Sequence, residues 1–281
     1  MSSFGTRYVE ALAERGQLCA GIDPHSSLLA EWGLPDTVDG LERFALGAAE
    51  ALAPYVPVVK PQSAFYERFG SRGIAVLERV IATCRQAGAL VLLDVKRGDI
   101  GSTSQAYADA YLDPASPLAC DAVTVSPYLG FGSVQPFVET AGRHDAGLFV
   151  LALTSNKEAP EVQHARPADP GAGSVGELML DHLRRLNADD EPLGSYGAVV
   201  GATVNPMVGA ERVDFCFNGP ILAPGYGVQG GTAADIGRIF GPAARQVVAS
   251  TSRGLLRVGP SATALRDEAL RLRDELGTPG R

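Results

Sequence analysis

The segment LVLLDVKRGDIGSTSQAYADAYL, residues 90–112, contains the pattern that decides the fold. It opens with a largely apolar run at 90–96 and continues into a stretch that we expect to form a helix at 102–112. Near-continuous hydrophobicity is typical of strands that are covered on both faces, whereas half-exposed strands alternate apolar and polar residues. The segment therefore predicts one βα unit of a parallel sheet.

The same pattern recurs along the rest of the chain. Further apolar runs lie at 18–23, 56–61, 121–127, 147–155, 196–203, 220–226 and 246–252, and further helices are expected at 40–53, 71–87, 174–187 and 262–276. Eight βα units favour a closed (β/α)8 TIM barrel of the α/β class over an open doubly wound sheet. We predict a single domain over residues 1–281, with a long loop at about 156–174.

Composition limits the classes of partner. The chain has 281 residues, 46% of them hydrophobic, which is enough for one large core. Its formal net charge is −8 and its pI is near 5.1. Surfaces that bind nucleic acid or anionic membranes need clustered Lys and Arg, so we expect neither partner. An anionic ligand must then be bound by local groups.

The cysteines and the amino terminus predict a cytoplasmic protein. Cys19, Cys84, Cys120 and Cys216 lie far apart and form no CxxC pair, which favours reduced thiols in a cytosolic protein. The first 16 residues lack the apolar segment of a signal peptide, and no stretch has the apolar length that crosses a bilayer.

Polar residues stand at or near the carboxyl ends of the predicted strands. They are Asp23, Lys60, Asp94, Lys96, Ser126, Ser155 and Thr203. The loops at this end of a βα barrel converge and carry its chemistry. Residues two apart on a strand project to the same face, so we expect Asp94 and Lys96 to point toward one pocket.

A structural ion pair is the alternative interpretation of Asp94 and Lys96. This interpretation is weakened by further charges nearby. Asp23 and Lys60 end other predicted strands, and Asp99 lies in the loop that follows. Buried ion pairs often fail to repay the cost of their desolvation, so a whole network of them is a poor device for stabilising a fold. We therefore favour a functional role.

A glycine-rich segment, APGYGVQGGTAAD at 223–235, follows the seventh strand and precedes a helix. Its glycines match the G-x-G-x-x-G pattern of dinucleotide sites, but such a site opens the first βα unit and needs an acidic residue about twenty positions later. Residues 236–266 contain no Asp or Glu, which disfavours a nicotinamide site. Glycines still let backbone N–H groups approach an anion, and the helix amino terminus adds partial positive charge.

Arg253 ends the eighth strand in STSRG, residues 250–254. Its planar guanidinium can hold a phosphate through two parallel hydrogen bonds, although a surface salt bridge is the alternative for a single arginine. The loops after strands seven and eight are the usual phosphate cradle of these barrels. We predict a phosphate site formed by Arg253 and the glycine-rich segment.

In combination, these motifs resemble the orotidine 5'-phosphate decarboxylase family, in its longer bacterial branch. The residues that carry the resemblance are Asp94, Lys96, Asp99, Ile100 and Thr103 in DVKRGDIGST, Asp23 in GIDP, Lys60 in VKPQSAFYERFG, Ser155 in TSN, Gln229 in APGYGVQGG and Arg253 in SRG. The resemblance covers all eight βα units. The motif D-x-K alone also occurs in sister phosphosugar decarboxylases and epimerases, and GATVNP at 201–206 is a local departure without a fixed catalytic demand.

The resemblance implies conversion of orotidine 5'-monophosphate (OMP) to UMP and carbon dioxide, the last step of de novo pyrimidine synthesis, without cofactor or metal. Loss of carbon dioxide leaves a carbanion on the pyrimidine ring, and fixed charges must stabilise it where it forms. Lys96 is then the stabilising cation and proton donor. Asp94 repels the departing carboxylate in the ground state. Lys60 and Asp99 hold these two side chains charged and oriented.

The resemblance also implies the contacts to the substrate. Asp23 binds ribose hydroxyls, Ser155 binds the pyrimidine edge, and the phosphate is held by Gln229 and Arg253 with Gly230 and Gly254 beside them. Remote phosphate binding can close loops over the charged site. The working unit implied is a homodimer with shared active sites, in which Asp99, Ile100 and Thr103 enter the pocket of the partner.

Two rival functions stay open at this level. A metal-dependent phosphosugar decarboxylase would need Mg²⁺ among its carboxylates. A sensor of phosphorylated nucleotides would need the phosphate site but no Lys96, so the presence of Asp94 and Lys96 argues against it.

Overall fold

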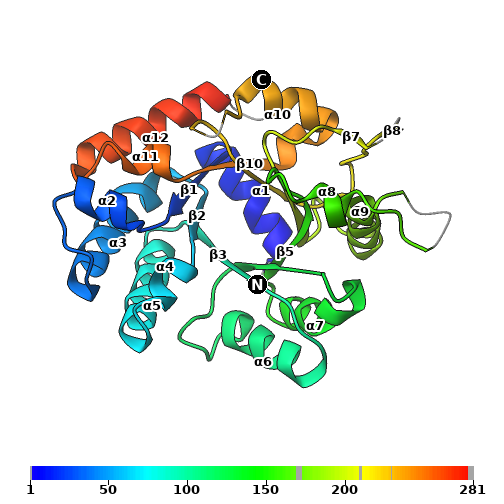
Figure 1. Ribbon diagram of the computed structural model, residues 1–281, viewed down its shortest axis with the longest axis horizontal. Helices are drawn as coiled ribbons and strands as arrows, with labels where there is room; N and C mark the ends of the chain where they lie inside the picture. Colours follow the sequence, from blue (N-terminus) through cyan, green and yellow to red (C-terminus); the bar gives the residue numbers. More distant parts are fainter. Residues whose placement is uncertain (1, 169–172, 209–210, 229, 278–281) are drawn as a thin grey trace.

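The computed structural model describes residues 2–168, 173–208, 211–228 and 230–277, and it contains a closed parallel barrel (Figure 1). The eight barrel strands are β1 (Leu18–Ile22), β2 (Val58–Pro61), β3 (Leu90–Arg97), β4 (Ala122–Val125), β5 (Gly147–Leu153), β6 (Tyr196–Val200), β9 (Ile221–Pro224) and β10 (Val247–Thr251). Each pairs with its neighbours along the chain, and β10 pairs with β1 to close the ring. All eight predicted runs form these strands, so the predicted TIM barrel is confirmed.

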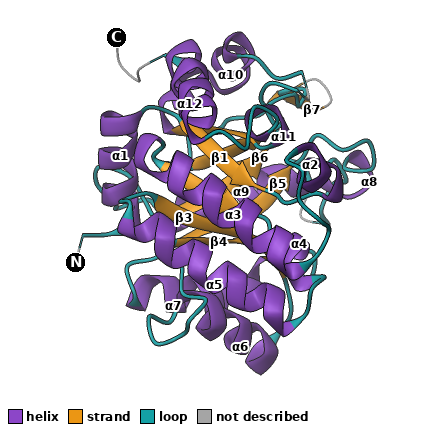
Figure 2. Cartoon of the chain, turned by 90° about the vertical axis from the view of Figure 1, so that its left-hand side faces the viewer, coloured by secondary structure: helices purple, strands orange, loops and turns teal. Residues whose placement is uncertain are grey.

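Helices surround the strands, as Figure 2 shows. The longer ones are α3 (Val38–Leu52), α5 (Ser71–Gln86), α6 (Gly101–Leu112), α7 (Gln135–Arg143), α9 (Val175–Leu186), α10 (Ala233–Phe240) and α12 (Ala262–Leu276). The five helices predicted from the sequence agree with observed ones to within two residues at each end. Apolar residues of these helices and the outward side chains of the strands form one large buried cluster, which holds the helix layer against the barrel.

The amino-terminal helix α1 (Phe4–Arg15) closes the end of the barrel opposite the strands' carboxyl ends (Figure 1). Its buried side chains Phe4, Tyr8 and Leu12 form a second apolar cluster with residues from inside the barrel, such as Phe149. The Tyr8 hydroxyl donates a hydrogen bond to the carbonyl of Gln246 at 2.8 Å. Apolar side chains thus fill the interior of the barrel at this end.

Several short elements were not predicted. They are helices α2 (Ser26–Glu31), α4 (Ala64–Glu67), α8 (Pro160–Gln163) and α11 (Arg253–Leu256), and a small antiparallel pair, β7 (Met207–Val208) and β8 (Glu211–Arg212). The predicted long loop at 156–174 contains α8, and Gln163 ties it to the end of β5 through two hydrogen bonds with Thr154. No helix in the described ranges is long and apolar enough to cross a membrane. One domain over 1–281 stays our prediction.

Candidate active site

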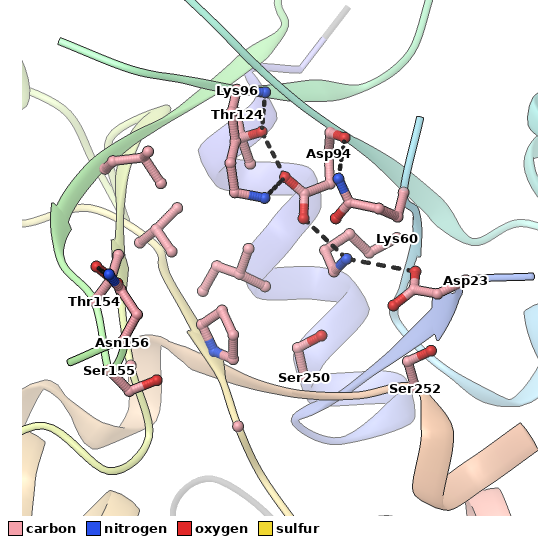
Figure 3. Close-up of a pocket in the computed structure, with 17 residues that line it drawn as sticks. Asp23, Lys60, Asp94, Lys96, Thr124, Thr154, Ser155, Asn156, Ser250 and Ser252 are labelled. Atoms are coloured by element: carbon pink, nitrogen blue, oxygen red, sulfur yellow. Dashed lines mark hydrogen bonds and ion pairs between the residues drawn. The ribbon is translucent and has the colours of Figure 1, made fainter. Parts of the chain in front are cut away.

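A cavity of about 430 Å³ opens at the carboxyl ends of the barrel strands (Figure 3). Five of the predicted site residues line it: Asp23, Lys60, Asp94, Lys96 and Ser155. They follow or end β1, β2, β3 and β5, and the barrel brings these strand ends around one opening. The structure therefore places the charges that follow separate strands in one pocket.

The charged side chains form a row with alternating sign along the cavity wall, shown by the dashed lines in Figure 3. Lys60 Nζ lies 3.8 Å from Asp23 Oδ1 and 3.0 Å from Asp94 Oδ2. The other oxygen of Asp94, Oδ1, lies 2.5 Å from Lys96 Nζ. Lys60 is only 6% exposed, whereas Lys96 is 45% exposed, so Lys96 is the cation that a ligand can reach.

Burial and charge act in opposite directions on this row. Burial disfavours the charge of Lys60, but the carboxylates of Asp23 and Asp94 outweigh it and hold the pKa of Lys60 above its ordinary value. Burial likewise opposes ionisation of Asp94, but Lys60 and Lys96 outweigh it and lower the pKa of Asp94 well below its usual range. Lys60 and Asp94 are therefore charged at neutral pH.

The end of β3 departs from regular strand geometry. Lys96 has a φ of 46°, in the left-handed region that side chains rarely adopt, and the register between β3 and β4 shifts between Leu93 and Arg97. Strand alternation was therefore the wrong reason for expecting Asp94 and Lys96 in one pocket. An irregular backbone turns Lys96 back toward the Asp94 carboxylate, and such conformations persist where surrounding contacts hold them.

Two residues missed in the sequence hold this irregular strand end. Thr124 on β4 is fully buried, and its hydroxyl lies 2.9 Å from Asp94 Oδ1. The same hydroxyl accepts hydrogen bonds from the backbone N–H groups of Val95 and Lys96, each at 3.0 Å. Gln62, after β2, donates from Nε2 to the Asp94 carbonyl at 3.1 Å.

The cavity also has an apolar wall, and two buried polar atoms at its lining lack a hydrogen bond from the described protein residues. Leu151, Val199, Leu222 and Pro224 line the cavity together with the charged row. Within the described part of the chain, the buried atoms Asp23 Oδ1 and Ser252 Oγ make no hydrogen bond. Buried polar atoms are nearly always hydrogen-bonded in native proteins, so these two are available to a polar ligand in the cavity. An apolar wall with a few polar groups is typical of a small-molecule site.

A smaller cavity of about 100 Å³ adjoins the first and contains the predicted residues Arg253 and Gly254. Both cavities include Asp23 and Ser252 in their linings, so one extended ligand can occupy both. His25, another residue missed in the sequence, lines the smaller cavity and packs on Phe65 with ring centroids 4.1 Å apart. Burial lowers the pKa of His25.

The helix expected to help hold a phosphate is already capped by its own residues. At the start of α10, Asp235 Oδ2 accepts hydrogen bonds from the backbone N–H and the hydroxyl of Thr232, and the Thr232 hydroxyl accepts from the Asp235 N–H. This capping box places a carboxylate at the helix start and uses two of its backbone N–H groups, while the phosphate site itself stays a prediction. Gly230 is exposed and lines neither cavity, and Gln229 lies outside the described residues.

Other predicted residues lie away from both cavities of their own chain. Ile100 is 62% exposed, Thr103 is exposed, and the Asp99 carboxylate accepts a hydrogen bond from the N–H of Ile100. Ser126 and Thr203, at the ends of β4 and β6, also line neither cavity.

The rarity of lysine in the sequence is a further signal for the site. Only three of the 24 basic residues are lysines, and two of those three, Lys60 and Lys96, belong to the charged row. Lysine differs from arginine in carrying a compact point charge on a flexible stem and in being able to lose a proton, so lysines in a chain that otherwise uses arginine indicate positions where these properties matter. Thr124 and Ser252 carried no such signal, since hydroxyl residues are common at strand ends.

The fold and the cavity define a class of protein, and comparison with known proteins then identifies the family. The geometry defines a (β/α)8-barrel enzyme that binds a small, partly polar ligand at the carboxyl ends of its strands. The model of the orotidine 5'-phosphate decarboxylase / HUMPS family matches residues 16–267. The chain belongs to this family.

Individual relatives agree with this assignment over their full length. The chain is 68% identical to an orotidine 5'-phosphate decarboxylase of Nocardioides over 98% of this chain and 99% of the relative. It is 58% identical to one of Streptomyces coelicolor over 99% of this chain and 98% of the relative. A solved Leishmania donovani OMP decarboxylase superposes with a TM-score of 0.72 and 31% identity, covering 97% of this chain and 99% of that one.

Proposed function

We propose that the chain decarboxylates OMP to UMP and carbon dioxide, the last step of de novo pyrimidine synthesis, in the cavity at the carboxyl ends of the strands. The row of Asp23, Lys60, Asp94 and Lys96 is the observation that carries this assignment. Its reachable end is a lysine ammonium beside an apolar wall, which suits a flat ring that acquires negative charge.

Lys96 performs the charge stabilisation and the proton transfer. The bond between the ring carbon and the carboxylate breaks, carbon dioxide leaves, and the electron pair stays on the ring carbon. The Lys96 ammonium stabilises that pair and then donates a proton to the same carbon, and the neutral amine regains a proton from water. The exposed fraction of Lys96, 45%, allows this exchange with solvent.

Asp94 and Lys60 keep Lys96 in place and charged. Asp94 Oδ1 binds Lys96 Nζ, while Lys60 neutralises the other oxygen of Asp94. The substrate carboxylate lies beside Asp94, and their repulsion eases when carbon dioxide leaves. Fixed charges of this kind need no reorganisation during the reaction, which is the main advantage of an enzyme site over water.

Asp23 and Ser155 bind the nucleoside part of the substrate. The buried Asp23 Oδ1 has no hydrogen bond among the described residues, so a ribose hydroxyl can donate to it. Ser155, on the opposite side of the cavity in Figure 3, reaches the pyrimidine edge. The two contacts orient the ring against Lys96, because they lie on either side of the space where it binds.

Arg253 and Gly254 hold the phosphate in the smaller cavity. Arg253 offers a planar set of donors, and a Cβ at position 254 would come within 2.9 Å of Val228 Cγ2. The sequence resemblance adds Gln229 and Gly230 as further phosphate contacts, of which Gln229 lies outside the described residues. The helix start at α10 has no part in it, because Asp235 caps that helix.

Replacing Arg253 with alanine is expected to weaken UMP binding by at least about 100-fold, since charge-assisted bidentate contacts to phosphate are lost. Binding of the nucleoside uridine, which has no phosphate, should stay within about threefold of wild type. Titration calorimetry with both ligands measures the difference. Arg257→Ala, at an exposed arginine one turn further along the chain, is the matched control. Equal losses for UMP and uridine would show that Arg253 does not bind phosphate.

We also propose that the working unit is a homodimer with shared sites. The loops after β3 and β4 start side by side, since Ser126 N, just after β4, donates to the carbonyl of Arg97 at the end of β3 at 2.8 Å. These loops expose Ile100, Tyr128 and Leu129, with exposed fractions of 62%, 76% and 55%. An exposed apolar patch beside a cavity supports a protein interface there. Asp99, Ile100 and Thr103 then reach the partner's pocket.

A direct assay tests the proposed reaction. The purified chain, mixed with OMP, should cause the loss of ultraviolet absorbance that accompanies decarboxylation, and the rate should survive an excess of chelator. Activity lost with the chelator would favour a metal-dependent sister reaction. Tight UMP binding without turnover would favour a nucleotide sensor.

The four free cysteines suit a reducing compartment, and we place the protein in the cytoplasm.

A further inference from the structure

We propose that Thr124 is a positioning residue for the reaction, and that its hydroxyl holds Lys96 and Asp94 in their relative geometry. The inference rests on the proposed function and deepens it. Thr124 lines the cavity at the end of β4, on the strand beside the one that carries both charges (Figure 3). It is fully buried.

The hydroxyl of Thr124 uses its whole hydrogen-bonding capacity on these neighbours. A threonine hydroxyl has one hydrogen to donate and two lone pairs. The backbone N–H groups of Val95 and Lys96 can only donate, so they occupy both lone pairs at 3.0 Å each. The hydrogen is then directed to Asp94 Oδ1 at 2.9 Å, because an ionised carboxylate only accepts.

These three bonds replace regular strand pairing where β3 becomes irregular. The register between β3 and β4 shifts between Leu93 and Arg97, and the two N–H groups point at the Thr124 side chain. Lys96 adopts a φ of 46°, which an L-residue leaves readily unless contacts hold it. Thr124 supplies one such contact, because its hydroxyl accepts the hydrogen bond from the N–H of Lys96 itself.

Thr124 therefore connects the Asp94 carboxylate with the Lys96 ammonium through hydrogen bonds. One oxygen atom binds the main chain of Lys96 and the carboxylate of Asp94, and that carboxylate binds Lys96 Nζ at 2.5 Å. The ring Thr124–Asp94–Lys96 is therefore closed by hydrogen bonds. Without the hydroxyl, the buried N–H of Val95 and the partly buried N–H of Lys96 lose their acceptor, and Asp94 loses one of the bonds that orient it.

The test compares two substitutions at one position. Thr124→Val keeps the shape of the side chain and removes the hydroxyl, whereas Thr124→Ser keeps the hydroxyl. Thr140→Val is the matched control, because Thr140 on α7 is also fully buried and its hydroxyl accepts from Gln105 Nε2 at 3.0 Å and Arg143 Nη2 at 2.7 Å, far from the cavity. For each protein, kcat with OMP, the dissociation constant of UMP and the melting temperature are measured.

We expect kcat of Thr124→Val to fall by about 100-fold, because small misplacements of reacting groups cost this much. UMP affinity should stay within about threefold, since the product makes the same contacts without the developing charge. Thr124→Ser should keep kcat within about tenfold of wild type, and Thr140→Val should lower the melting temperature and leave kcat unchanged. Amide exchange at Val95 and Lys96 should accelerate in Thr124→Val alone.

Three outcomes would overturn the inference. The first is a kcat of Thr124→Val equal to that of the Thr140→Val control. The second is a parallel loss of kcat and UMP affinity in Thr124→Val. The third is a kcat of Thr124→Ser as low as that of Thr124→Val. If Thr124→Val does not fold, Thr124→Ala takes its place, with an expected loss in kcat of at least about tenfold at unchanged UMP affinity. A wild-type chain without turnover would instead refute the proposed function.

Discussion

Replacing Lys96 with alanine is expected to lower kcat by at least about 1,000-fold, because the substitution removes the stabilising charge and the proton donor together. UMP affinity should change by less than about tenfold, since the ammonium acts chiefly when negative charge develops on the ring. Steady-state kinetics with OMP and calorimetric titration with UMP measure the two quantities.

The site should survive this substitution. Asp94 keeps Lys60 Nζ at 3.0 Å and the Thr124 hydroxyl at 2.9 Å, so its carboxylate stays paired. Lys157→Ala is the matched control, since Lys157 is the one lysine outside the charged row and its side chain is 92% exposed. The control should retain wild-type kcat and UMP affinity.

A Lys96→Ala protein that keeps more than about a tenth of wild-type kcat would contradict the role given to Lys96, because a tenfold change corresponds to only about 1.4 kcal/mol of barrier. A parallel loss of UMP affinity would instead assign Lys96 to ground-state binding.

Mixing two inactive proteins, Lys96→Ala and Asp99→Ala, is expected to restore about a quarter of wild-type activity under closed two-fold symmetry. Asp99 does not line the cavity of its own chain, and its carboxylate accepts a hydrogen bond from the N–H of its neighbour Ile100. If Asp99 reaches the partner's pocket, one site of a mixed dimer carries both defects. The other combines an intact Lys96 with an intact Asp99.

The expected fraction follows from the statistics of exchange. Random reassortment of equal amounts makes about half of the dimers mixed, and each mixed dimer has one sound site of two. A mixture of Lys96→Ala with Lys60→Ala is the control. Lys60 and Lys96 line the same cavity of one chain, so every site in that mixture retains a defect and no activity should return.

Subunit exchange is verified with differently tagged chains before activity is measured. Exchange without any recovered activity would show that Asp99 acts within its own chain. A chain that stays monomeric at assay concentrations while turning over OMP would refute the shared site altogether.

Local patterns in the sequence were sufficient for the barrel and for the charged row. Apolar runs such as 90–96 and 147–155 predict buried strands because each run has to be covered on both faces. Eight of them with intervening helices favour one closed architecture, which the structure confirms. Once the strands are parallel in a barrel, Asp23, Lys60, Asp94 and Lys96 must meet at one end.

The tertiary structure alone decided how those charges are held. The left-handed φ of Lys96, the register shift in β3 and the three bonds of Thr124 depend on how β3 lies against β4, which hydrophobic periodicity does not encode. The capping of α10 by Asp235 and the direction of Asp99 depend on side-chain and loop geometry in the same way. Periodicity reports which face of an element is buried, whereas a hydrogen bond between strands depends on register and atom positions, and these exist only in the folded chain.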